Sequence, residues 1–391
     1  MKIDRHRHRR GLGGLEDAAT IPPPWLHPLA GAKWSHYREL ISRHRTVPPR
    51  SRFQRLFLAF ALLQRTPLAW IEARLEALRD RLSCATPEPG RPPLFLIGHW
   101  GSGTTWLHQI LSLDSQFGYP DVGDTLMPWN LNETSRYCRA FVRPALPRDR
   151  LFDAVGVCLE DPQEEEVALA AMGPVSYFLS LYFPSETEGH LCRALFPERA
   201  AAEEREAFEE AYRLFHQRIR RKCSGRRILF KNPASTTRIA MLRRLFPGAQ
   251  FVHLVRNPFE VYAAAINRIP YLLNGFALED FRHLSLERLV LETYESLMRR
   301  YLEDRALLPP EDLVEVRFEE LEQDRPAVIS RIYKQLGIDG AERVIDAVRA
   351  KEESEPPYRR TSRPLAPEVA ARVAQAWRFA FDAWGYAGST E

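Results

Sequence analysis

Cysteine is rare in this sequence, and the few cysteines form no pattern. The 391 residues contain five, and no C-x-x-C pair occurs among them. An odd number of widely spaced cysteines indicates neither a zinc site nor a disulfide framework, so we expect no metal centre. Free thiols are typical of reducing compartments, and we therefore expect a cytoplasmic protein. The five are Cys84, Cys138, Cys158, Cys192 and Cys223.

The sequence also lacks a hydrophobic run long enough to cross a membrane. Its most apolar stretch, residues 53–71, is interrupted by Arg55 and Arg65. The uncharged run between them is far shorter than the ~20 apolar residues that a spanning helix needs. The first ten residues are charged and contain no apolar segment of the kind found in secretory signals. Residues 53–71 therefore predict a helix that packs on the core, with peripheral membrane contact as the alternative.

Lysine is scarce as well, since only six of the 55 basic residues are lysines. The formal net charge of +4 is small for a nucleic-acid-binding domain, so we expect no nucleic-acid partner. An arginine-rich chain with a weak net charge is better suited to one groove that binds an anion. The hydrophobic content of 45% is typical of a globular protein, and the length allows one large α/β domain or two smaller ones.

One stretch joins a short apolar run to a glycine-rich turn and a helix start. Leu94 to Ile97 has the composition of a buried parallel strand, and a turn from Gly98 to Gly103 follows. The next residues, from Thr104, begin a helix. Such a turn gathers backbone N–H groups around a concave site that binds phosphate-like anions. The alternative is that the turn only connects a strand to a helix.

The spacing of this turn is that of the P-loop, G-x-x-x-x-G-K-S/T, with Thr104 in the position of the lysine. In enzymes that use ATP or GTP, that lysine contacts the β- and γ-phosphates. A loop without it indicates an anionic ligand that has no γ-phosphate. The sequence therefore disfavours an NTPase.

Strands and helices alternate after this loop, with strands expected at 226–231, 250–255 and 313–317 and helices at 236–246 and 286–307. The rhythm predicts an α/β fold in which helices flank a P-loop-like parallel sheet.

The part before the loop is different, because residues 34–43 and 52–81 have helical patterns, the second interrupted at Pro67. We expect a helical N-terminal extension over residues 1–90, with a disordered start, ahead of a nucleotide-binding domain over 91–391.

Two motifs together resemble the sulfotransferases that use 3′-phosphoadenosine-5′-phosphosulfate (PAPS). The loop from His99 to Trp106 is similar to their 5′-phosphosulfate motif, P-K/R-S-G-T-T-W/L. A strand that ends in Arg256-Asn257-Pro258 and runs into a helix is similar to their 3′-phosphate motif, R-N/D-P. The resemblance covers residues 92–386 and extends to features of bacterial members at Lys231-Asn232-Pro233, Pro162–Glu166 and Trp384–Tyr386.

The resemblance implies that the cofactor is PAPS, which leaves as 3′-phosphoadenosine-5′-phosphate (PAP). The loop would hold the 5′-phosphate and the sulfate, and Trp106 would stack on adenine or, alternatively, belong to the core. Arg256 would bind the 3′-phosphate in bidentate fashion, with a surface ion pair as the alternative. A late basic segment is similar to the loop that closes over the cofactor, unless it is only solvated. The implied cofactor-binding residues are Gly101, Ser102, Gly103, Thr104, Thr105, Trp106, Arg256, Arg359 and Arg360.

The chain departs from the family pattern at two positions. Gly101 stands where the family has a lysine or arginine that stabilises the leaving oxygen, and Ala264 stands where a serine often binds the 3′-phosphate. Lys231, His99 or a closing arginine could replace the missing cation, and the sequence does not choose among them. The second departure indicates weaker or rearranged contacts to the 3′-phosphate.

The resemblance also implies a general base, and Glu164 is the first candidate because it lies in P-Q-E-x-E. The local pattern offers a structural alternative, in which Asp161 caps a helix, Pro162 is its first residue and Glu164 completes a capping box. His108 shares a helix face with Thr104, so it lies either near the ligand or packed in the core.

The function that follows is transfer of a sulfuryl group from PAPS to a hydroxyl or amine of a small-molecule, lipid or glycan acceptor. Aromatic- and proline-rich stretches at 117–152 and 174–197 indicate an apolar cleft for that acceptor. Two alternatives remain: an atypical P-loop kinase, which the missing lysine disfavours, and a non-catalytic nucleotide-binding module, which Gly101 favours.

Overall fold

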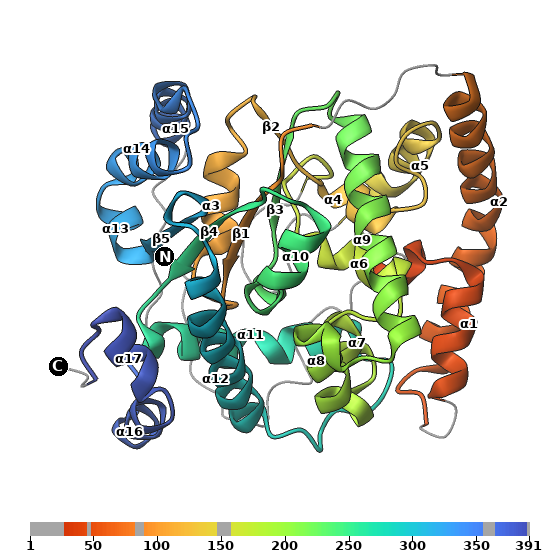
Figure 1. Ribbon diagram of the computed structural model, residues 1–391. Helices are drawn as coiled ribbons and strands as arrows, with labels where there is room; N and C mark the ends of the chain where they lie inside the picture. Colours follow the sequence, from red (N-terminus) through yellow and green to blue (C-terminus); the bar gives the residue numbers. More distant parts are fainter. Residues whose placement is uncertain (1–26, 45–47, 83–89, 147–157, 355–363, 389–391) are drawn as a thin grey trace, which may run out of the picture.

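A parallel five-stranded sheet lies at the centre of the computed structural model, which describes residues 27–44, 48–82, 90–146, 158–354 and 364–388 (Figure 1). The strand order is β2-β3-β1-β4-β5. The first strand in the sequence is thus the middle strand of the sheet. The strands are β1 (Leu94–Gly98), β2 (Phe117–Gly118), β3 (Arg227–Lys231), β4 (Gln250–Val255) and β5 (Leu313–Arg317).

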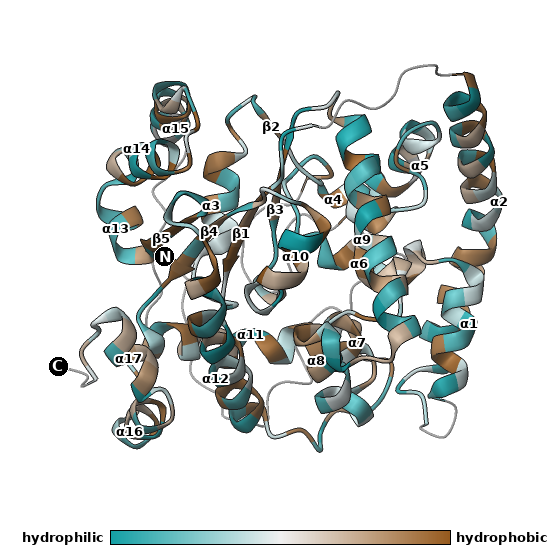
Figure 2. Ribbon diagram, in the orientation of Figure 1, coloured by the Kyte–Doolittle hydropathy of each residue, from teal (hydrophilic) through white to brown (hydrophobic). Residues whose placement is uncertain are grey.

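The middle strand β1 is apolar along its whole length because helices cover both faces of the sheet. Every residue of β1 is buried, and the strand pairs with β3 on one side and with β4 on the other. Its side chains alternate, so that Phe95 and Ile97 join one hydrophobic core whereas Leu94 and Leu96 join a second. Figure 2 shows β1 and β4 in the brown of hydrophobic residues between helices of mixed character.

Each core packs against its own set of helices. The core of Leu94 and Leu96 includes side chains of α3 (Thr104–Leu111), α14 (Arg325–Gln335) and α15 (Ala341–Ser354). The core of Phe95 and Ile97 includes the long helices α9 (Ala202–Lys222) and α12 (Leu286–Asp304). The remaining helices are α1 (Trp34–Arg43), α2 (Arg52–Leu82), α4 (Val122–Leu126), α5 (Ser135–Val142), α6 (Glu166–Met172), α7 (Phe178–Tyr182), α8 (Thr187–Leu195), α10 (Ile239–Leu245), α11 (Pro258–Phe276), α13 (Phe318–Gln323), α16 (Pro367–Ala376) and α17 (Arg378–Trp384).

The architecture confirms the predicted fold class, including a helical region before the sheet, where α1 and α2 lie. The strands at 250–255 and 313–317 have their predicted bounds. The carboxyl ends of β3, β1 and β4 meet at one edge of the sheet, which is where ligands bind in open α/β folds. Residues 1–26, with the predicted disordered start, and Arg359 and Arg360 lie outside the described residues.

The predicted interruption of the second helix at Pro67 is wrong, because α2 continues from Arg52 to Leu82. A proline inside a helix leaves the carbonyl four residues earlier without its donor. Pro67 and Leu63 are both exposed, so water can satisfy that carbonyl. The hydroxyl of Thr66 also donates to the carbonyl of Leu62 at 2.8 Å, which supports the same turn.

The predicted helix start at Asp161 is also wrong, since α6 begins at Glu166. The residues before it form a turn, and Asp161 and Pro162 pair with the start of α4. The amide of Val122 donates to the carbonyl of Asp161 at 3.0 Å, and Asp121 and Pro162 form an isolated antiparallel bridge. These contacts keep the Pro162 region out of a helical conformation.

Candidate active site

The glycine-rich loop follows β1 and ends at the N-terminus of α3. Gly101 and Gly103 have φ angles of +93° and +96°, which only glycine adopts readily. A Cβ at Gly103 would overlap the ring of Phe318. Gly103 is the N-cap of α3 and provides no side-chain cap, so the first amides of the helix, at Thr104 and Thr105, have no intrahelical acceptor. These amides are available to an anion.

Two further features of the loop fit a bound phosphate or sulfate. The hydroxyl of Ser102 is buried and has no hydrogen-bond partner among the described residues. A buried polar atom of this kind usually has a partner in the functional state of a protein. Thr105 and Trp106, which follow on α3, are only half-buried and lie where the helix begins.

Arg256 connects the second predicted motif to the loop. Its Nη1 donates to the carbonyl of Gly101 at 2.9 Å, its Nη2 lies 3.2 Å from a carboxylate oxygen of Glu260, and its guanidinium stacks on Phe318 at 4.4 Å. Arg256 directly follows β4, the neighbour of β1. The structure therefore brings the two motifs, about 150 residues apart in the sequence, into direct contact at one edge of the sheet.

The side chain of Trp106 lies on the same side of the loop as Arg256. Its ring centroid is 5.6 Å from that of Phe318, and the guanidinium of Arg325 lies 4.8 Å from the Trp106 ring. Phe318 thus separates Arg256 from Trp106 and packs under Gly103. Sequence reasoning missed Phe318, although it is the first residue after β5 and so comes from the same edge of the sheet.

The other side of the loop, toward β3, carries a buried ion pair. Nζ of Lys231, the last residue of β3, lies 2.8 Å from Oε2 of Glu164, and both side chains are about 5% exposed. The hydroxyl of Tyr177 donates to the other oxygen of Glu164. Burial raises the pKa of the Glu164 carboxyl, but the charges of Lys231 and Arg268 and these two hydrogen bonds outweigh it, so the pKa lies below its ordinary value. Glu164 is therefore an ionised carboxylate at neutral pH.

The two glutamates that follow Glu164 have different partners. Glu165 accepts a hydrogen bond from Tyr212, and Glu166 forms a bidentate pair with Arg238 at 2.7 and 3.1 Å. The capping-box account of Glu164 is wrong, because the helix begins two residues later and the carboxylate binds Lys231 instead.

His99 and His108 are both buried, but only His99 reaches a cavity. Nδ1 of His99 lies 2.7 Å from the carbonyl of Trp100, which can only accept, so Nδ1 carries the proton. Its Nε2 then has a lone pair and no partner among the described residues. Burial lowers the pKa of His99 to about 4. For His108, burial and the charge of Lys231 lower the pKa well below its usual value, so both rings are neutral at pH 7.

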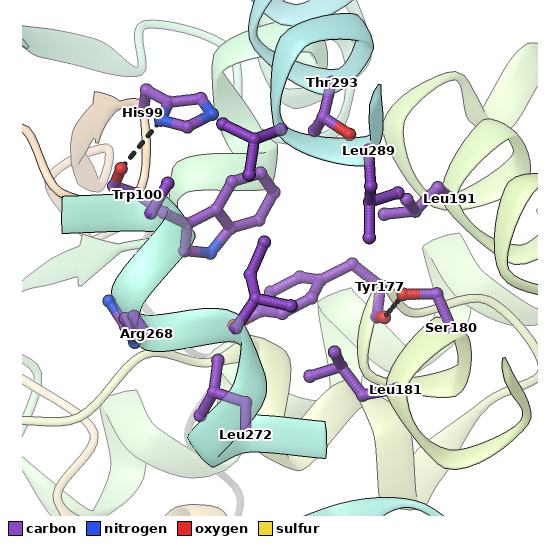
Figure 3. Close-up of a pocket in the computed structure, with 13 residues that line it drawn as sticks. His99, Trp100, Tyr177, Ser180, Leu181, Leu191, Arg268, Leu272, Leu289 and Thr293 are labelled. Carbon is purple, nitrogen blue, oxygen red and sulfur yellow. Dashed lines mark hydrogen bonds between the residues drawn. The ribbon is translucent and has the colours of Figure 1, made fainter. Parts of the chain in front are cut away.

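An apolar cavity opens beside His99 and the Glu164–Lys231 pair. Figure 3 shows Trp100, Tyr177 and Leu272 around it, and the charged residue that lines it is Arg268 from α11. The predicted cleft stretch 174–197 contributes to the wall, whereas the described part of 117–152 does not. The lining residues are His99, Trp100, Tyr177, Ser180, Leu181, Leu191, Ala265, Arg268, Ile269, Leu272, Leu289, Val290 and Thr293.

A cluster away from this edge has the composition of a metal site. Ligand atoms of His44, Glu186 and His190 lie within 4.8 Å of one another. However, Nη2 of Arg193 donates to Nδ1 of His190 at 3.1 Å, so the proton of His190 sits on Nε2, 3.4 Å from Nε2 of His44. His44 then keeps its proton on Nδ1, which faces Glu279 at 3.4 Å. A hydrogen-bond chain explains the cluster without a metal.

A P-loop-like turn without its lysine, an arginine after the neighbouring strand and an ionised glutamate beside them define a site for transfer of an anionic group. The family model described as "Sulfotransferase family" matches residues 92–342, which is more than half of the chain. The chain therefore belongs to the sulfotransferase family and is an enzyme that transfers a sulfuryl group from a sulfate donor.

Similar proteins of known name are mycobacterial sulfotransferases. The omega-hydroxy-beta-dihydromenaquinone-9 sulfotransferase Stf3 of Mycobacterium bovis is 29% identical over 369 residues, covering 93% of this chain and 92% of that protein, and its Mycobacterium tuberculosis counterpart matches equally. The crystal structure of sulfotransferase STF9 from Mycobacterium avium has a TM-score of 0.67 at 16% identity and covers 94% of this chain and 97% of its own. That of STF1 from M. tuberculosis has a TM-score of 0.59 at 16% identity, covering 88% and 93%.

Proposed function

We propose that this enzyme transfers the sulfuryl group of PAPS to a hydroxyl group of a lipid. The observation that carries the proposal is the apolar cavity, which begins beside the anion-binding loop and next to Glu164. A cavity lined mainly by leucine, isoleucine, valine and aromatic side chains favours a long apolar chain over a sugar. The name of the Stf3 relatives, whose acceptor is a hydroxylated menaquinone, supports the same class of acceptor.

PAPS supplies a sulfuryl group that is bound to a good leaving group, so the protein has only to bind, orient and move one proton. The amides of Thr104 and Thr105 would hold the 5′-phosphosulfate at the N-terminus of α3. Arg256 would exchange its contacts to Gly101 and Glu260 for the 3′-phosphate. Trp106 would contact the adenine with the face that Arg325 does not cover.

Glu164 is the residue that we assign as the general base. Its carboxylate is ionised, and each of its oxygens keeps a lone pair beyond the hydrogen bond that it accepts from Tyr177 or Lys231. A hydroxyl group at the inner end of the cavity, beside Tyr177, would donate to Glu164 and lose its proton as the new bond forms. Lys231 would then hold the protonated side chain of Glu164 in place through its hydrogen bond.

His99 is a second candidate for the base, because the lone pair of its Nε2 has no partner among the described residues and the ring lines the cavity. His108 lacks that access, since it is fully buried beside Lys231.

We also propose that the enzyme works in the cytoplasm at the surface of a membrane, with α2 as the contact. The four cysteines in the described part of the chain are free thiols, which suits a reducing compartment. Among the described helices, α2 is long and apolar enough to span a membrane. Only 22% of its most apolar stretch is buried in the protein, so most of that stretch is open to a membrane. Its other face is fixed to the body, for example by Glu76 and Arg218 at 2.7 Å, so it would lie on a membrane.

Turnover of labelled PAPS with lipid alcohols tests the function. We expect sulfated product with farnesol and with a hydroxylated menaquinone, and none with glucose. Glu164→Gln should lower kcat by about 10²–10⁴-fold, the usual contribution of a general base, while the Kd for PAP changes little because Glu164 lies on the acceptor side of the loop. Under the same conditions, His99→Asn should retain most of the activity.

Two results would contradict this proposal. A larger loss of kcat in His99→Asn than in Glu164→Gln would move the base to the histidine. Tight binding of PAP without turnover of any acceptor would favour the non-catalytic module. The exposed Glu210→Gln, on α9, is the matched control for a loss of one carboxylate.

A further inference from the structure

The loop lacks a cation at Gly101, and the expected replacements that the structure describes are engaged elsewhere. The closing arginines, Arg359 and Arg360, lie outside the described residues. Lys231 is paired with Glu164 at 2.8 Å. His99 is neutral, because burial lowers its pKa to about 4. Arg256 lies on the far side of the loop, where it binds the Gly101 carbonyl. Within the part of the chain that the structure describes, a different group has to balance the charge that grows on the leaving phosphate oxygen.

Arg268 comes from the helix against which Gly101 packs. A Cβ at Gly101 would lie 2.9 Å from Cβ of Ala264, so the two positions at which this chain departs from the family pattern are in direct contact. Arg268 follows Ala264 by four residues on α11 and therefore shares its face. Figure 3 shows its guanidinium beside Trp100, at the edge of the cavity.

The surroundings of Arg268 are unusual for a charged residue. It lines the cavity among Leu272, Ile269 and Tyr177, and it is the charged side chain of this otherwise largely apolar wall. The charge of Arg268 also acts on Glu164, Tyr177 and His99, which places the guanidinium close to the proposed base and to the start of the loop.

We propose that Arg268 is a catalytic residue, which binds the sulfuryl oxygens of PAPS and replaces the missing cation of position 101. This inference rests on the proposed function. In the transfer, the acceptor oxygen forms a bond to sulfur, its proton goes to Glu164, and the bond between sulfur and the bridging oxygen breaks. The electron pair of that bond stays on the 5′-phosphate of PAP. Arg268 donates to the sulfuryl oxygens and the bridging oxygen throughout.

The first test needs no acceptor, because the sulfuryl group is present in PAPS and absent from PAP. Isothermal titration should show that Arg268→Gln weakens binding of PAPS by ~10-fold or more, as expected for loss of a charge-assisted hydrogen bond, while the Kd for PAP stays within about twofold. Arg378→Gln, at a side chain that is 84% exposed on α17, is the control for removal of a surface arginine. An unchanged ratio of PAPS to PAP affinity in Arg268→Gln would overturn the inference.

The second test separates a direct contact from an effect through Glu164. Removing the charge of Arg268 raises the pKa of Glu164, so a variant impaired only in this way regains its activity at higher pH. We expect instead that kcat with PAPS and farnesol falls ~100-fold at every pH between about 6 and 9 and that Arg268→Lys restores part of it. Recovery at high pH would show that Arg268 only positions the base. If the wild-type enzyme binds neither PAP nor PAPS, the proposed function itself fails.

Discussion

At the scale of residues, three consecutive glutamates show how their surroundings divide their roles. Glu164 is ionised beside Lys231, and Glu166 is held by Arg238 in a bidentate pair that joins α6 to the segment after β3. Glu165 accepts a hydrogen bond from the hydroxyl of Tyr212 and forms no ion pair among the described residues. Burial is the main cause that raises the pKa of Glu165 to about 7, although the hydrogen bond from Tyr212 lowers it. One segment thus supplies the proposed base, a carboxyl that takes up a proton near neutral pH and a structural anchor.

Glu165 makes the stability of the protein depend on pH. Its pKa is about 7 in the folded chain and 4.5 in the reference state, so between these values the folded state binds the extra proton. The contribution of this proton to the stability of the folded state is complete below pH 4.5 and is lost as the pH rises through about 7. Glu165→Gln resembles the protonated form. Its free energy of unfolding in urea, relative to wild type, should therefore increase from about pH 5 to about pH 8 by ~2–3 kcal/mol at most.

The matched control for this measurement is Glu210→Gln, because that side chain is 73% exposed and carries no buried charge. The difference in free energy of unfolding between Glu210→Gln and the wild type should be the same at both pH values. If the difference between Glu165→Gln and the wild type were also independent of pH, the carboxyl of Glu165 would be ionised in the folded protein over this whole pH range.

The sequence identifies only those site residues that belong to motifs. The glycine-rich loop, Lys231 and Arg256 follow strands, and their spacing makes them visible. Arg268 lies in α11 beyond the motif that begins this helix, and Phe318 belongs to no motif. They reach the site because α11 packs on Gly101 and α13 starts at the end of β5. Such contacts depend on tertiary packing, which a single sequence does not contain.

At the scale of elements, α2 has two apolar faces. One carries Leu58 and Leu62 into the core, together with Glu72, whose carboxylate accepts from the backbone of Asn132 and Thr134. The other is a stripe of exposed apolar residues that recur about every 3.6 positions, the period of a straight helix. Nine of the twelve large hydrophobic residues exposed in the described chain lie on α2. They are Phe53, Leu56, Phe60, Leu63, Trp70, Ile71, Leu75, Leu78 and Leu82.

The charges around this stripe fit a membrane surface. Between Arg52 and Arg74 every exposed residue of α2 is uncharged, and Arg65 turns inward to donate to the carbonyl of Ala30 at 3.0 Å. Arg74 lies over the ring of Trp70 at 4.9 Å, an arrangement in which an aromatic side chain can sit at the level of lipid headgroups.

We therefore expect the protein to co-sediment with vesicles of phosphatidylglycerol and phosphatidylcholine. The double variant Leu56→Ser/Phe60→Ser should weaken this binding at least about tenfold, because each exposed side chain loses ~1.5–3 kcal/mol of burial in the bilayer. Leu307→Ser removes an equally exposed apolar residue away from α2 and should bind as wild type does. The membrane contact would be refuted if the double variant bound the vesicles as tightly as the wild type does. It would also be refuted if the wild type formed a dimer through α2 that the double variant did not form.

Element boundaries follow from the sequence where one local signal dominates. The strands β4 and β5 have their predicted bounds: β4 is a mostly apolar segment, and β5 alternates buried Val314 and Val316 with exposed or half-buried residues. The start of α6 does not, because the bridge between Asp121 and Pro162 outweighs the helix-start signal of Asp161. Which face of α2 is buried is equally invisible in the sequence, since both faces are apolar.

At the scale of the whole molecule, the order of the strands places three parts of the proposed site side by side: the anion-binding loop, the cavity beside Glu164 and the site of Arg256. The loop after β1 lies between β3, which ends in Lys231, and β4, which leads to Arg256. The proposed acceptor cavity, with Glu164 beside it, is therefore on one side of the loop, and the proposed 3′-phosphate site is on the other. A ligand that fills both halves of the nucleotide site holds the neighbouring strands together and stabilises the fold.

This arrangement predicts that PAP raises the Tm more than 5′-AMP or ATP does. At a concentration of about 100 times its Kd, PAP should add ~2.7 kcal/mol to the free energy of unfolding, whereas 5′-AMP lacks the 3′-phosphate and ATP meets Thr104 where a P-loop lysine would stand. Arg256→Gln should abolish the advantage of PAP over 5′-AMP, and the surface variant Arg378→Gln should keep it. A larger shift with ATP would instead indicate kinase-like chemistry, and equal shifts with PAP and 5′-AMP in the wild-type protein would contradict the assignment of Arg256 to the 3′-phosphate.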